Sequence, residues 1–430
     1  MRFGVNYTPS QGWFHSWLDF DPDSVRHDFE AIARLGVDHV RIFPLWPIVQ
    51  PSRSLIRSAA LSDIGSVVDI AGEFGLDVNV DALQGHLSSF DFLPSWVQSW
   101  HRRNIFTDTQ VVNAEAHYIR TLARSLNHRP NLLGITLGNE LNQFASPPHP
   151  FPHSASEAQI DRWLAQLVAA ARAETTSLVT HALYDAAWFD DAQPFTPAQA
   201  AAVGDATIVH SWVFNGTAQR HGALGVGSIR HAEYELQLAA AWHDDPKRPL
   251  WLQEVGAPTN VIPAANAPEF LEFTIRRALT VHQLQLITWW SSHDVSRGLV
   301  DFPELEYDLG LFDAEGRLKP TGARYAELIA EFHSAPTAAA SSVGIVLDDT
   351  QPNYRAYCAP GGPFNEGWLA LATRLEVSPQ VVLKSRLGSV ALLEGRGITS
   401  LSHLTPQQHP VSVDAESATD ADTRKEGSYA

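Results

Sequence analysis

Two glutamates follow strand-like apolar runs in this sequence. Gly138, Asn139 and Glu140 follow the apolar run Leu132–Leu137, and Glu254 comes directly after the run Pro249–Gln253. A pair of carboxyl groups can cleave a glycosidic bond, because one protonates the leaving oxygen while the other attacks the sugar or activates water. One glutamate at a strand end is as often a plain solvated side chain. The pair, in a chain rich in tryptophan and histidine, favours paired-carboxylate chemistry.

The composition limits which partners the chain can have. Its 430 residues are 44% hydrophobic and 18% charged, which is typical of a globular protein with a large core. Lys and Arg number 30 against 48 Asp and Glu, a net charge of −18 that disfavours nucleic acid and anionic membranes as partners. No apolar run approaches the roughly 20 residues of a membrane span. With Cys358 as the single cysteine and a strand-like N-terminus, we expect a cytoplasmic protein.

The elements that must position the two glutamates alternate between strand-like and helix-like patterns. Glycines end several helices, and the sheet strands are short and apolar. Eight such units over residues 1–335 predict an α/β fold, a (β/α)8 TIM barrel with the catalytic groups at the carboxyl ends of its strands. A doubly wound open sheet is disfavoured because no Gly-rich phosphate loop follows a strand. The predicted strands are Phe3–Tyr7, Val37–Pro44, Leu76–Ala82, Leu132–Leu137, Leu178–Leu183, Thr207–His210, Leu250–Gln253 and Leu284–Trp290.

The remainder of the chain has a different character. A linker-like segment at 337–342 precedes a small appended module at 343–410. Within it we expect short strands at Val343–Leu347, Val381–Lys384 and Ser389–Leu393, separated by turns. Residues 411–430 are polar and lack apolar periodicity, so they are expected to be disordered. A structural role, or contact between copies of the chain in a homo-oligomer, is the expected use of this module.

With these positions in place, the sequence resembles the retaining glycosidases built on (β/α)8 barrels, most closely glycoside hydrolase family 5. The resemblance covers residues 1–333. It depends on Asn-Glu at the fourth strand, Glu at the seventh, Arg in the second, His in the sixth and Trp in the eighth, which here are Asn139, Glu140, Glu254, Arg41, His210 and Trp290.

The resemblance implies a role for each of these residues. Glu140 is the acid/base, Glu254 the nucleophile, and Asn139 the partner of the sugar's 2-hydroxyl. Arg41 keeps Glu254 ionised. Trp290 forms the floor of the −1 subsite, which holds the sugar whose C1 the nucleophile attacks. From the residues alone, Arg41 could equally be a plain salt bridge at the barrel mouth, and His210 a structural histidine.

Two departures from the family pattern leave alternatives open. The family's His-x-Tyr after the sixth strand reads His210-Ser211-Trp212 here, so the indole of Trp212 could replace the phenol that donates to the nucleophile. On the third strand, His86 and Gln84 are rival candidates for the family's histidine, because four residues separate Asp81 from His86.

The expected substrate is a small oligosaccharide, cleaved without metal or organic cofactor. The opening Phe3–Tyr7 followed by Trp13–Trp17, and His293-Asp294 after the eighth strand, look most like the β-mannosidase branch, which makes Trp13 and Asp294 substrate-binding candidates. This favours a β-1,4-mannoside such as mannosyl-β-1,4-N-acetylglucosamine or a short manno-oligosaccharide. The alternatives are a β-glucosidase, an endo-β-1,4-glucanase or mannanase, and a sugar-binding barrel without catalysis.

Two loops predict a pocket closed at one end, and therefore exo action. The connection Asn142–Ser156 carries Pro147, Pro148, Pro150 and Pro152 and should form a rigid lid with Phe151 packed inward. The segment Ser291–Phe312, with Phe302 and Tyr307, should form a second wall. His149 and His153 have the spacing of a loop metal pair, but the proline-rich surroundings favour the lid.

Overall fold

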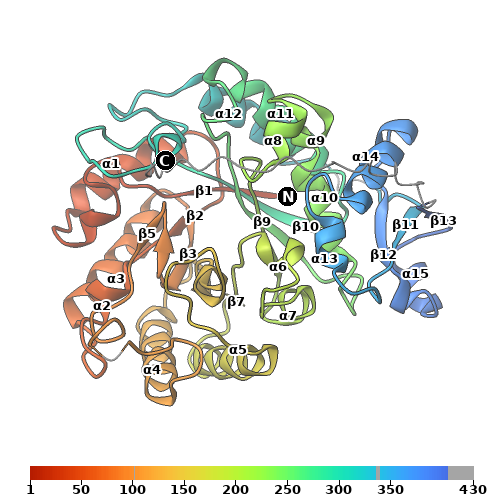
Figure 1. Cartoon of the computed structure of the whole chain (residues 1–430). Helices are drawn as coiled ribbons and strands as arrows, with labels where there is room; N and C mark the ends of the chain where they lie inside the picture. Colours follow the sequence, from red (N-terminus) through yellow and green to blue (C-terminus); the bar gives the residue numbers. More distant parts are fainter. Residues whose placement is uncertain (101, 336–338, 405–430) are drawn as a thin grey trace, which may run out of the picture.

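Eight short parallel strands curl around one axis (Figure 1). The computed structural model describes residues 1–100, 102–335 and 339–404. The strand order is β7-β6-β3-β2-β1-β10-β9-β8, so neighbours in the sequence are neighbours in the sheet. Asp205 bridges the seam between β7 and β8, since its N–H donates to Val179 O (2.9 Å) and its carboxylate accepts from Val179 N (2.7 Å). The strands are β1 Arg2–Asn6, β2 His39–Ile42, β3 Asp77–Leu83, β6 Leu132–Gly138, β7 Leu178–Thr180, β8 Thr207–Ser211, β9 Leu250–Val255 and β10 Leu284–Trp289.

Helices on the outside of the barrel cover the strands, and aspartates cap the first turns of two of them. The Asp21 carboxylate accepts from Asp23 N, and that of Asp108 accepts from Gln110 N and Val111 N. The (β/α)8 barrel and its predicted strands are confirmed. The main helices are α1 Pro22–Ala33, α3 Ser58–Glu73, α4 Thr109–Leu126, α5 Glu157–Arg172, α10 His231–Ala240, α11 Ala267–Ala278 and α12 Pro320–Phe332.

Shorter elements lie in the connections that follow the barrel strands. They include a two-stranded hairpin that follows β3, made of β4 His86–Leu87 and β5 Phe90–Asp91. The short helices are α2 Trp46–Val49, α6 Ala186–Phe189, α7 Pro197–Ala202, α8 Thr217–His221 and α9 Val226–Ile229. The 3-10 turns are η1 Trp13–Trp17, η2 Leu141–Ala145, η3 Ala264–Asn266 and η4 Glu304–Glu306.

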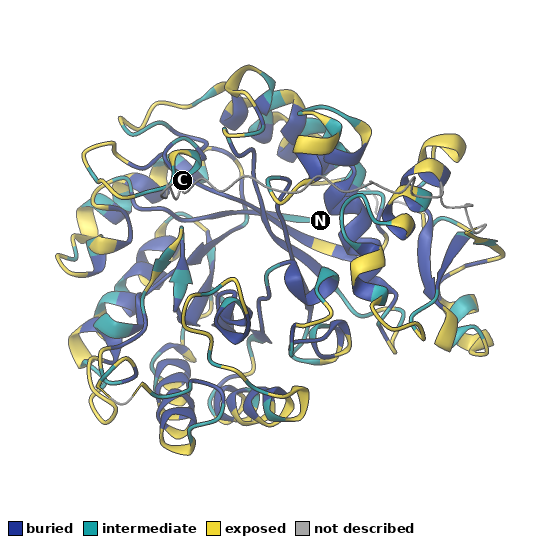
Figure 2. Ribbon diagram, in the orientation of Figure 1, coloured by how far each residue is buried: buried dark blue, intermediate teal, exposed yellow. Residues whose placement is uncertain are grey.

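Most residues of the barrel strands are buried (Figure 2), so the barrel interior is a packed core. Gly4 leaves room for the ring of His39, because a Cβ at Gly4 would lie 2.3 Å from His39 Nε2. That nitrogen and Trp251 Nε1 both lie 2.8 Å from Thr288 Oγ1. Burial lowers the pKa of His39 to about 3, so this histidine is a neutral packing group. Reactive groups are therefore left to the carboxyl ends of the strands.

The C-terminal module is a small parallel sheet with helices. Strands β11 Val343–Leu347 and β12 Gln380–Leu383 match the prediction, and the sheet order is β12-β11-β13. The predicted strand Ser389–Leu393 is wrong: Val390–Gly395 is helix α15, and the third strand is β13 Ser400–His403. The predicted turns also contain helices α13 Tyr354–Cys358 and α14 Pro363–Leu375, and η5 Lys384–Arg386 follows β12. Parallel strands require crossover connections, which helices supply.

The module is fastened to the barrel by buried polar contacts. One guanidinium nitrogen of Arg355 donates to the carbonyl oxygens of Asp190, Gln193 and Phe195 at 3.0–3.1 Å. Tyr234 of α10 donates to Cys358 O at 2.8 Å. The predicted tail at 411–430 lies outside the described residues. Among the helices of the described part of the chain, we find none with the length and hydropathy of a membrane span.

Candidate active site

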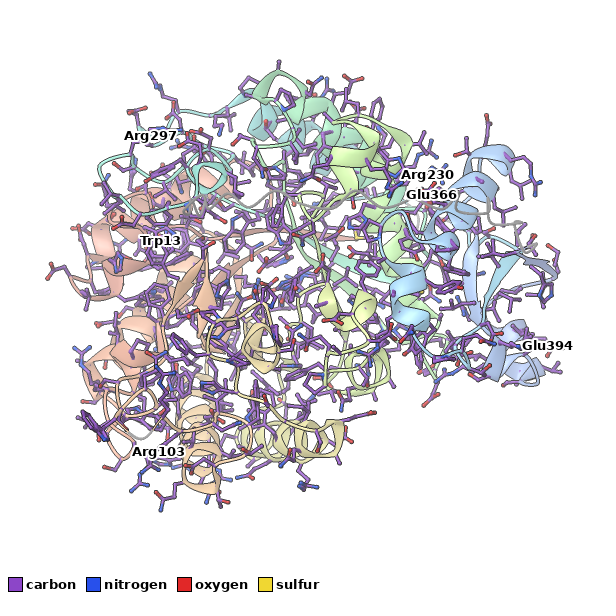
Figure 3. The ribbon with its side chains drawn as sticks, in the orientation of Figure 1. Trp13, Arg103, Arg230, Arg297, Glu366 and Glu394 are labelled. Atoms are coloured by element: carbon purple, nitrogen blue, oxygen red, sulfur yellow. The ribbon has the colours of Figure 1, made fainter. Side chains whose placement is uncertain are left out.

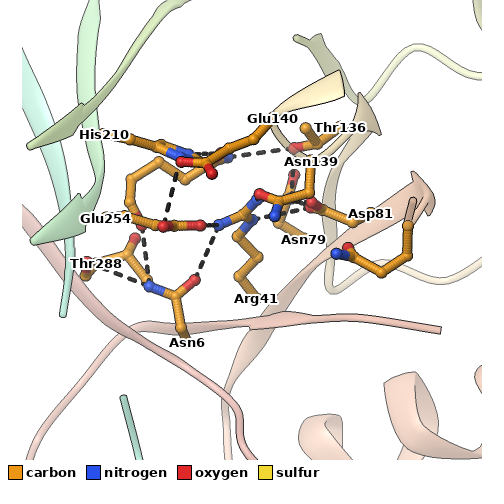
Figure 4. Close-up of polar contacts among 12 residues, drawn as sticks. Asn6, Arg41, Asn79, Asp81, Thr136, Asn139, Glu140, His210, Glu254 and Thr288 are labelled. Atoms are coloured by element: carbon orange, nitrogen blue, oxygen red, sulfur yellow. Dashed lines mark hydrogen bonds and ion pairs between the residues drawn. The ribbon is translucent and has the colours of Figure 1, made fainter. Parts of the chain in front are cut away.

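Arg41 of β2 is the centre of a polar network at the carboxyl ends of the barrel strands (Figure 4). Its Nε and Nη2 bind both oxygens of Asp81 at 2.9 and 2.6 Å, and Nη2 also donates to Asn139 Oδ1 at 2.6 Å. Its Nη1 donates to Glu254 Oε1 at 2.6 Å and to Asn6 Oδ1 at 3.2 Å. Arg41 is completely buried. One cation therefore fixes side chains from four other strands or strand ends.

Glu254, near the end of β9, has partners at both carboxylate oxygens. Besides the bond from Arg41 to Oε1, the indole Nε1 of Trp212 donates to Oε2 at 3.3 Å, and His210 Nδ1 lies 3.4 Å from the same oxygen. Trp212 thus occupies the place of the family's tyrosine as a donor to this carboxylate. Burial raises the pKa of Glu254, and the charges of His210 and Arg41 oppose that rise.

Glu140 sits on a sharp turn between β6 and the 3-10 turn η2. Its backbone is left-handed (φ 47°, ψ 34°), an uncommon conformation for a residue other than glycine. Its Oε1 lies 2.7 Å from His210 Nδ1, and its Oε2 accepts from Gln143 Nε2 at 2.8 Å. Burial acts to raise the pKa of Glu140, but the hydrogen bond and charge of His210 outweigh it, so this pKa is lowered.

His210 connects the two glutamates through a defined tautomer. Gln253 Nε2 donates to Thr136 Oγ1 at 3.2 Å, which turns Gln253 Oε1 towards His210 Nε2 at 3.3 Å. His210 Nε2 therefore carries a hydrogen, and Nδ1 shares one proton with Glu140. Burial lowers the pKa of His210, but Glu254 and Glu140 outweigh it, so the pKa is raised.

Glu140, Glu254 and His210 lie close together. One oxygen of Glu140, one oxygen of Glu254 and one ring nitrogen of His210 are all within 4.8 Å of one another. The same three atoms are the one set among the described residues with a spacing suited to a metal ion. A cation there would face the guanidinium of Arg41, whose Nη1 already occupies Glu254 Oε1 at 2.6 Å. This donor set therefore suits proton exchange better than metal binding.

The other predicted site residues surround this centre. Asn139 follows β6 and donates from Nδ2 to His86 O at 3.1 Å. The His86 ring reaches the mouth, where its charge acts on Glu140, whereas Gln84 is fully buried and donates to His86 O. His86 is thus the one of the two rival residues that can meet a ligand. Trp290 follows β10 and packs edge-on against Trp212, with ring centroids 6.3 Å apart.

Two predicted substrate contacts differ from expectation. Trp13 is 2% exposed and packs against Phe302 and other rings, so it supports a wall instead of offering an open stacking face. Asp294 binds Lys319 Nζ through both oxygens (2.8 and 3.0 Å) and accepts from Gly310 N at 2.7 Å. Asp294 thus anchors the connection between β10 and α12. A residue beside a predicted strand end can serve either as such an anchor or as a substrate contact.

The proline-rich loop is held by its histidines. His149 Nε2 lies 3.0 Å from Asp91 Oδ2, and His153 Nδ1 accepts from Ile105 N at 3.1 Å. Separate partners for the two rings exclude the metal pair in this arrangement. Phe151 is 56% exposed with Arg102 stacked over it, so the expectation that it packs inward is wrong.

Sequence reasoning missed a third carboxyl group at the mouth. Glu306 of η4 accepts from Ser88 Oγ at 2.9 Å, and its charge interacts with those of Glu254 and Glu140. Burial raises the pKa of Glu306 to about 7. It lies in Asp301–Asp308, which holds four acidic residues, and only the fold distinguishes the one that turns inward. Gln253 was missed as well, although it directly precedes the predicted nucleophile Glu254.

Comparison with known proteins gives a consistent assignment. No family model and no curated protein matches the chain. A solved GH5_18 variant from Streptomyces cattleya in complex with Manβ1-4GlcNAc is 49% identical (94% of this chain, 98% of that chain, TM-score 0.92). The same group from that organism in complex with GlcNAc is 50% identical, with the same coverage and TM-score. A GH5_18 variant from Bifidobacterium longum subsp. longum, also with Manβ1-4GlcNAc, is 45% identical (94% and 96%, TM-score 0.91).

Identity at this level over nearly the whole length of each structure agrees with the residue pattern found around Arg41. The predicted resemblance to the β-mannosidase-like branch is confirmed at the level of the family. The chain is a glycoside hydrolase and belongs to glycoside hydrolase family 5, with the GH5_18 proteins.

Proposed function

We propose that this protein is a retaining, exo-acting β-mannosidase that hydrolyses Manβ1-4GlcNAc and short β-1,4-manno-oligosaccharides. The observation that carries the proposal is the spacing of the two glutamates, whose oxygens approach within 4.8 Å. Retaining enzymes hold their carboxyl groups about 5–5.5 Å apart, whereas inverting enzymes separate them by about 6.5–9.5 Å to admit a water. A cytoplasmic location is part of the same proposal.

The surroundings of the two glutamates support distinct roles. Glu254, bonded to Arg41 and Trp212, is held as a carboxylate and acts as the nucleophile. Glu140 shares a proton with His210 and acts as the acid/base. Asn139, fixed by Arg41, binds the 2-hydroxyl, and Trp290 lies beneath the sugar.

Hydrolysis then proceeds in two displacements. Glu254 attacks C1 while the proton from Glu140 moves to the glycosidic oxygen, so the C1–O bond breaks and the leaving sugar departs neutral. Water next attacks C1 of the glycosyl–Glu254 ester, and Glu140, now a carboxylate, takes its proton. The second step releases the sugar with its original anomeric configuration and restores both carboxyl groups.

A hollow beside Glu140 supports the choice of leaving sugar. Its volume is about 270 Å³, and its lining includes Gln143, Pro148, Tyr184 and Gln193. Gln143 also binds Glu140, so this hollow adjoins the proton donor. GH5_18 relatives bind GlcNAc and Manβ1-4GlcNAc, which supports GlcNAc as its occupant.

The direct test compares Manβ1-4GlcNAc with Glcβ1-4GlcNAc, which differ only in the configuration at C2. We expect kcat/KM for the mannoside to be higher by about tenfold or more, because one hydrogen bond to O2 from a buried donor is worth about 1.4 kcal/mol. Mannotetraose should lose one mannose at a time. Equal rates would favour a β-glucosidase, and early mannobiose would favour an endo enzyme.

Replacing each glutamate with alanine should give opposite rescue patterns. Glu254→Ala should lose about three or more orders of magnitude in kcat, since no other group can form the ester, and azide should restore turnover. Glu140→Ala should still form the ester from a dinitrophenyl β-mannoside, whose leaving group needs no proton. Melting temperatures close to that of the wild type provide the folding control. The reverse pattern would exchange the two roles.

His210→Asn should move the alkaline limb of the kcat/KM profile to lower pH. The active form needs one proton on the Glu140–His210 pair, and that proton is lost as the pH rises through the raised pKa of His210. The wild type can hold this proton on Glu140 or on His210, whereas the variant can hold it only on Glu140. The variant therefore loses the proton at a lower pH. His128→Asn, at an exposed histidine, is the matched control. An unchanged limb would remove His210 from the proton-sharing role.

A further inference from the structure

Glu306 offers an acceptor oxygen at the mouth of the site that the proposed chemistry does not use. Its Oε2 accepts from Ser88 Oγ at 2.9 Å, while its Oε1 has no hydrogen-bond partner among the described residues. The side chain is partly exposed, and its charge acts on Glu254, Glu140 and His86. Glu306 thus faces the space above the two reacting glutamates.

The loop that carries Glu306 is braced, so the side chain is held in position. Arg297, which is labelled in Figure 3, donates to Glu304 at 2.8 Å and to Asp308 at 2.7 Å; these acids lie two residues before and two residues after Glu306. The hydroxyl of Tyr307 donates to Leu299 O at 2.8 Å. At the base of the loop, Lys319 joins Asp294 and donates to Asp308 O.

An aromatic wall joins this loop to two others. We define it as Trp13 of η1, Phe90 of the β4–β5 hairpin, Phe92 directly after that hairpin, and Phe302 of the β10–α12 loop. Trp13 lies 4.7 Å from Phe302, 5.6 Å from Phe90 and 5.8 Å from Phe92, measured between ring centroids. Together with the Ser88–Glu306 hydrogen bond, these contacts close the mouth on this side.

The strand order places the loop with Glu306 opposite Glu140, and the β4–β5 hairpin lies between that loop and the hollow for the leaving sugar: His86, Ser89 and Asp91 line the hollow, whereas Ser88 binds Glu306. Glu140 follows β6, and the loop with Glu306 follows β10. Strands β3, β2 and β1 separate β6 from β10 on one side, and β9, β8 and β7 on the other, so the two are diametrically opposed. The leaving sugar lies next to its proton donor, in the hollow by Gln143. The far end of the terminal sugar therefore points to Glu306.

We propose that Glu306 accepts a hydrogen bond from the C4 hydroxyl of the terminal mannose and thereby restricts the enzyme to exo action. The inference deepens the β-mannosidase function proposed above and depends on it. In the interior of a β-1,4-linked chain, O4 carries another sugar and has no hydrogen to donate. An internal unit would leave Oε1 of Glu306 without a donor and press the next ring against the aromatic wall.

The test is a double-mutant cycle between protein and substrate, using an aryl β-mannoside and its 4-deoxy analogue. On the wild type, removing the 4-hydroxyl should lower kcat/KM by about 10- to 100-fold, the range for a hydrogen bond to a charged group. Glu306→Ala should lose a similar factor with the parent mannoside. With this variant the 4-deoxy analogue should be no worse than the parent, and Glu306→Gln should fall between.

Controls separate this inference from the function on which it depends. Asp301→Asn removes an exposed carboxylate five residues earlier in the same loop, one that takes no part in the Arg297 brace, and should retain the wild-type sensitivity to the 4-deoxy change. The 6-deoxy analogue should lose equal factors on the wild type and Glu306→Ala. If removing the 4-hydroxyl lowers kcat/KM as much for Glu306→Ala as for the wild type, Glu306 does not bind O4. If the wild type does not hydrolyse the parent mannoside, the proposed function itself fails.

Discussion

A single buried guanidinium organises this barrel mouth. Arg41 is completely buried, and a charge in that position is tolerated only when every donor is paired. Its partners are Asp81, Glu254, Asn6 and Asn139, which come from β3, β9, β1 and the end of β6. Each strand end is therefore fixed relative to the others before a sugar arrives. This is the preorganisation that electrostatic catalysis requires.

Charge is distributed unevenly around that centre. Arg41 neutralises Glu254, and His210, which lies between Glu140 and Glu254, provides one proton to these two carboxylates. The backbone of Glu140 is left-handed, so strain is located at the residue to which we assign the proton transfer. The residues that we propose to surround the sugar come from loops, while those that we propose to react come from strands and strand ends, as is usual in this fold.

Much of this could be predicted from the sequence, because short apolar strands alternate with amphipathic helices and place residues such as Glu140 and Glu254 at a common rim. The indole of Trp212 in place of a phenol was also predictable. The inward turn of Glu306 was not, since it depends on a salt-bridged loop whose acidic residues look alike. The ion pair of Asp294 was not predictable for a similar reason, because its partner Lys319 is 25 residues away along the chain. The helix at Val390–Gly395 follows from the parallel topology of the module, which local patterns do not reveal.

The central claim is that two carboxylates, held close together by Arg41 and His210, work by double displacement. Proton NMR of the reaction with an aryl β-mannoside measures this directly, because the anomeric signals show which form of mannose appears first. The account predicts β-mannose at early times, followed by slow mutarotation to the equilibrium mixture. Initial release of α-mannose would contradict the account and require a water between the two glutamates.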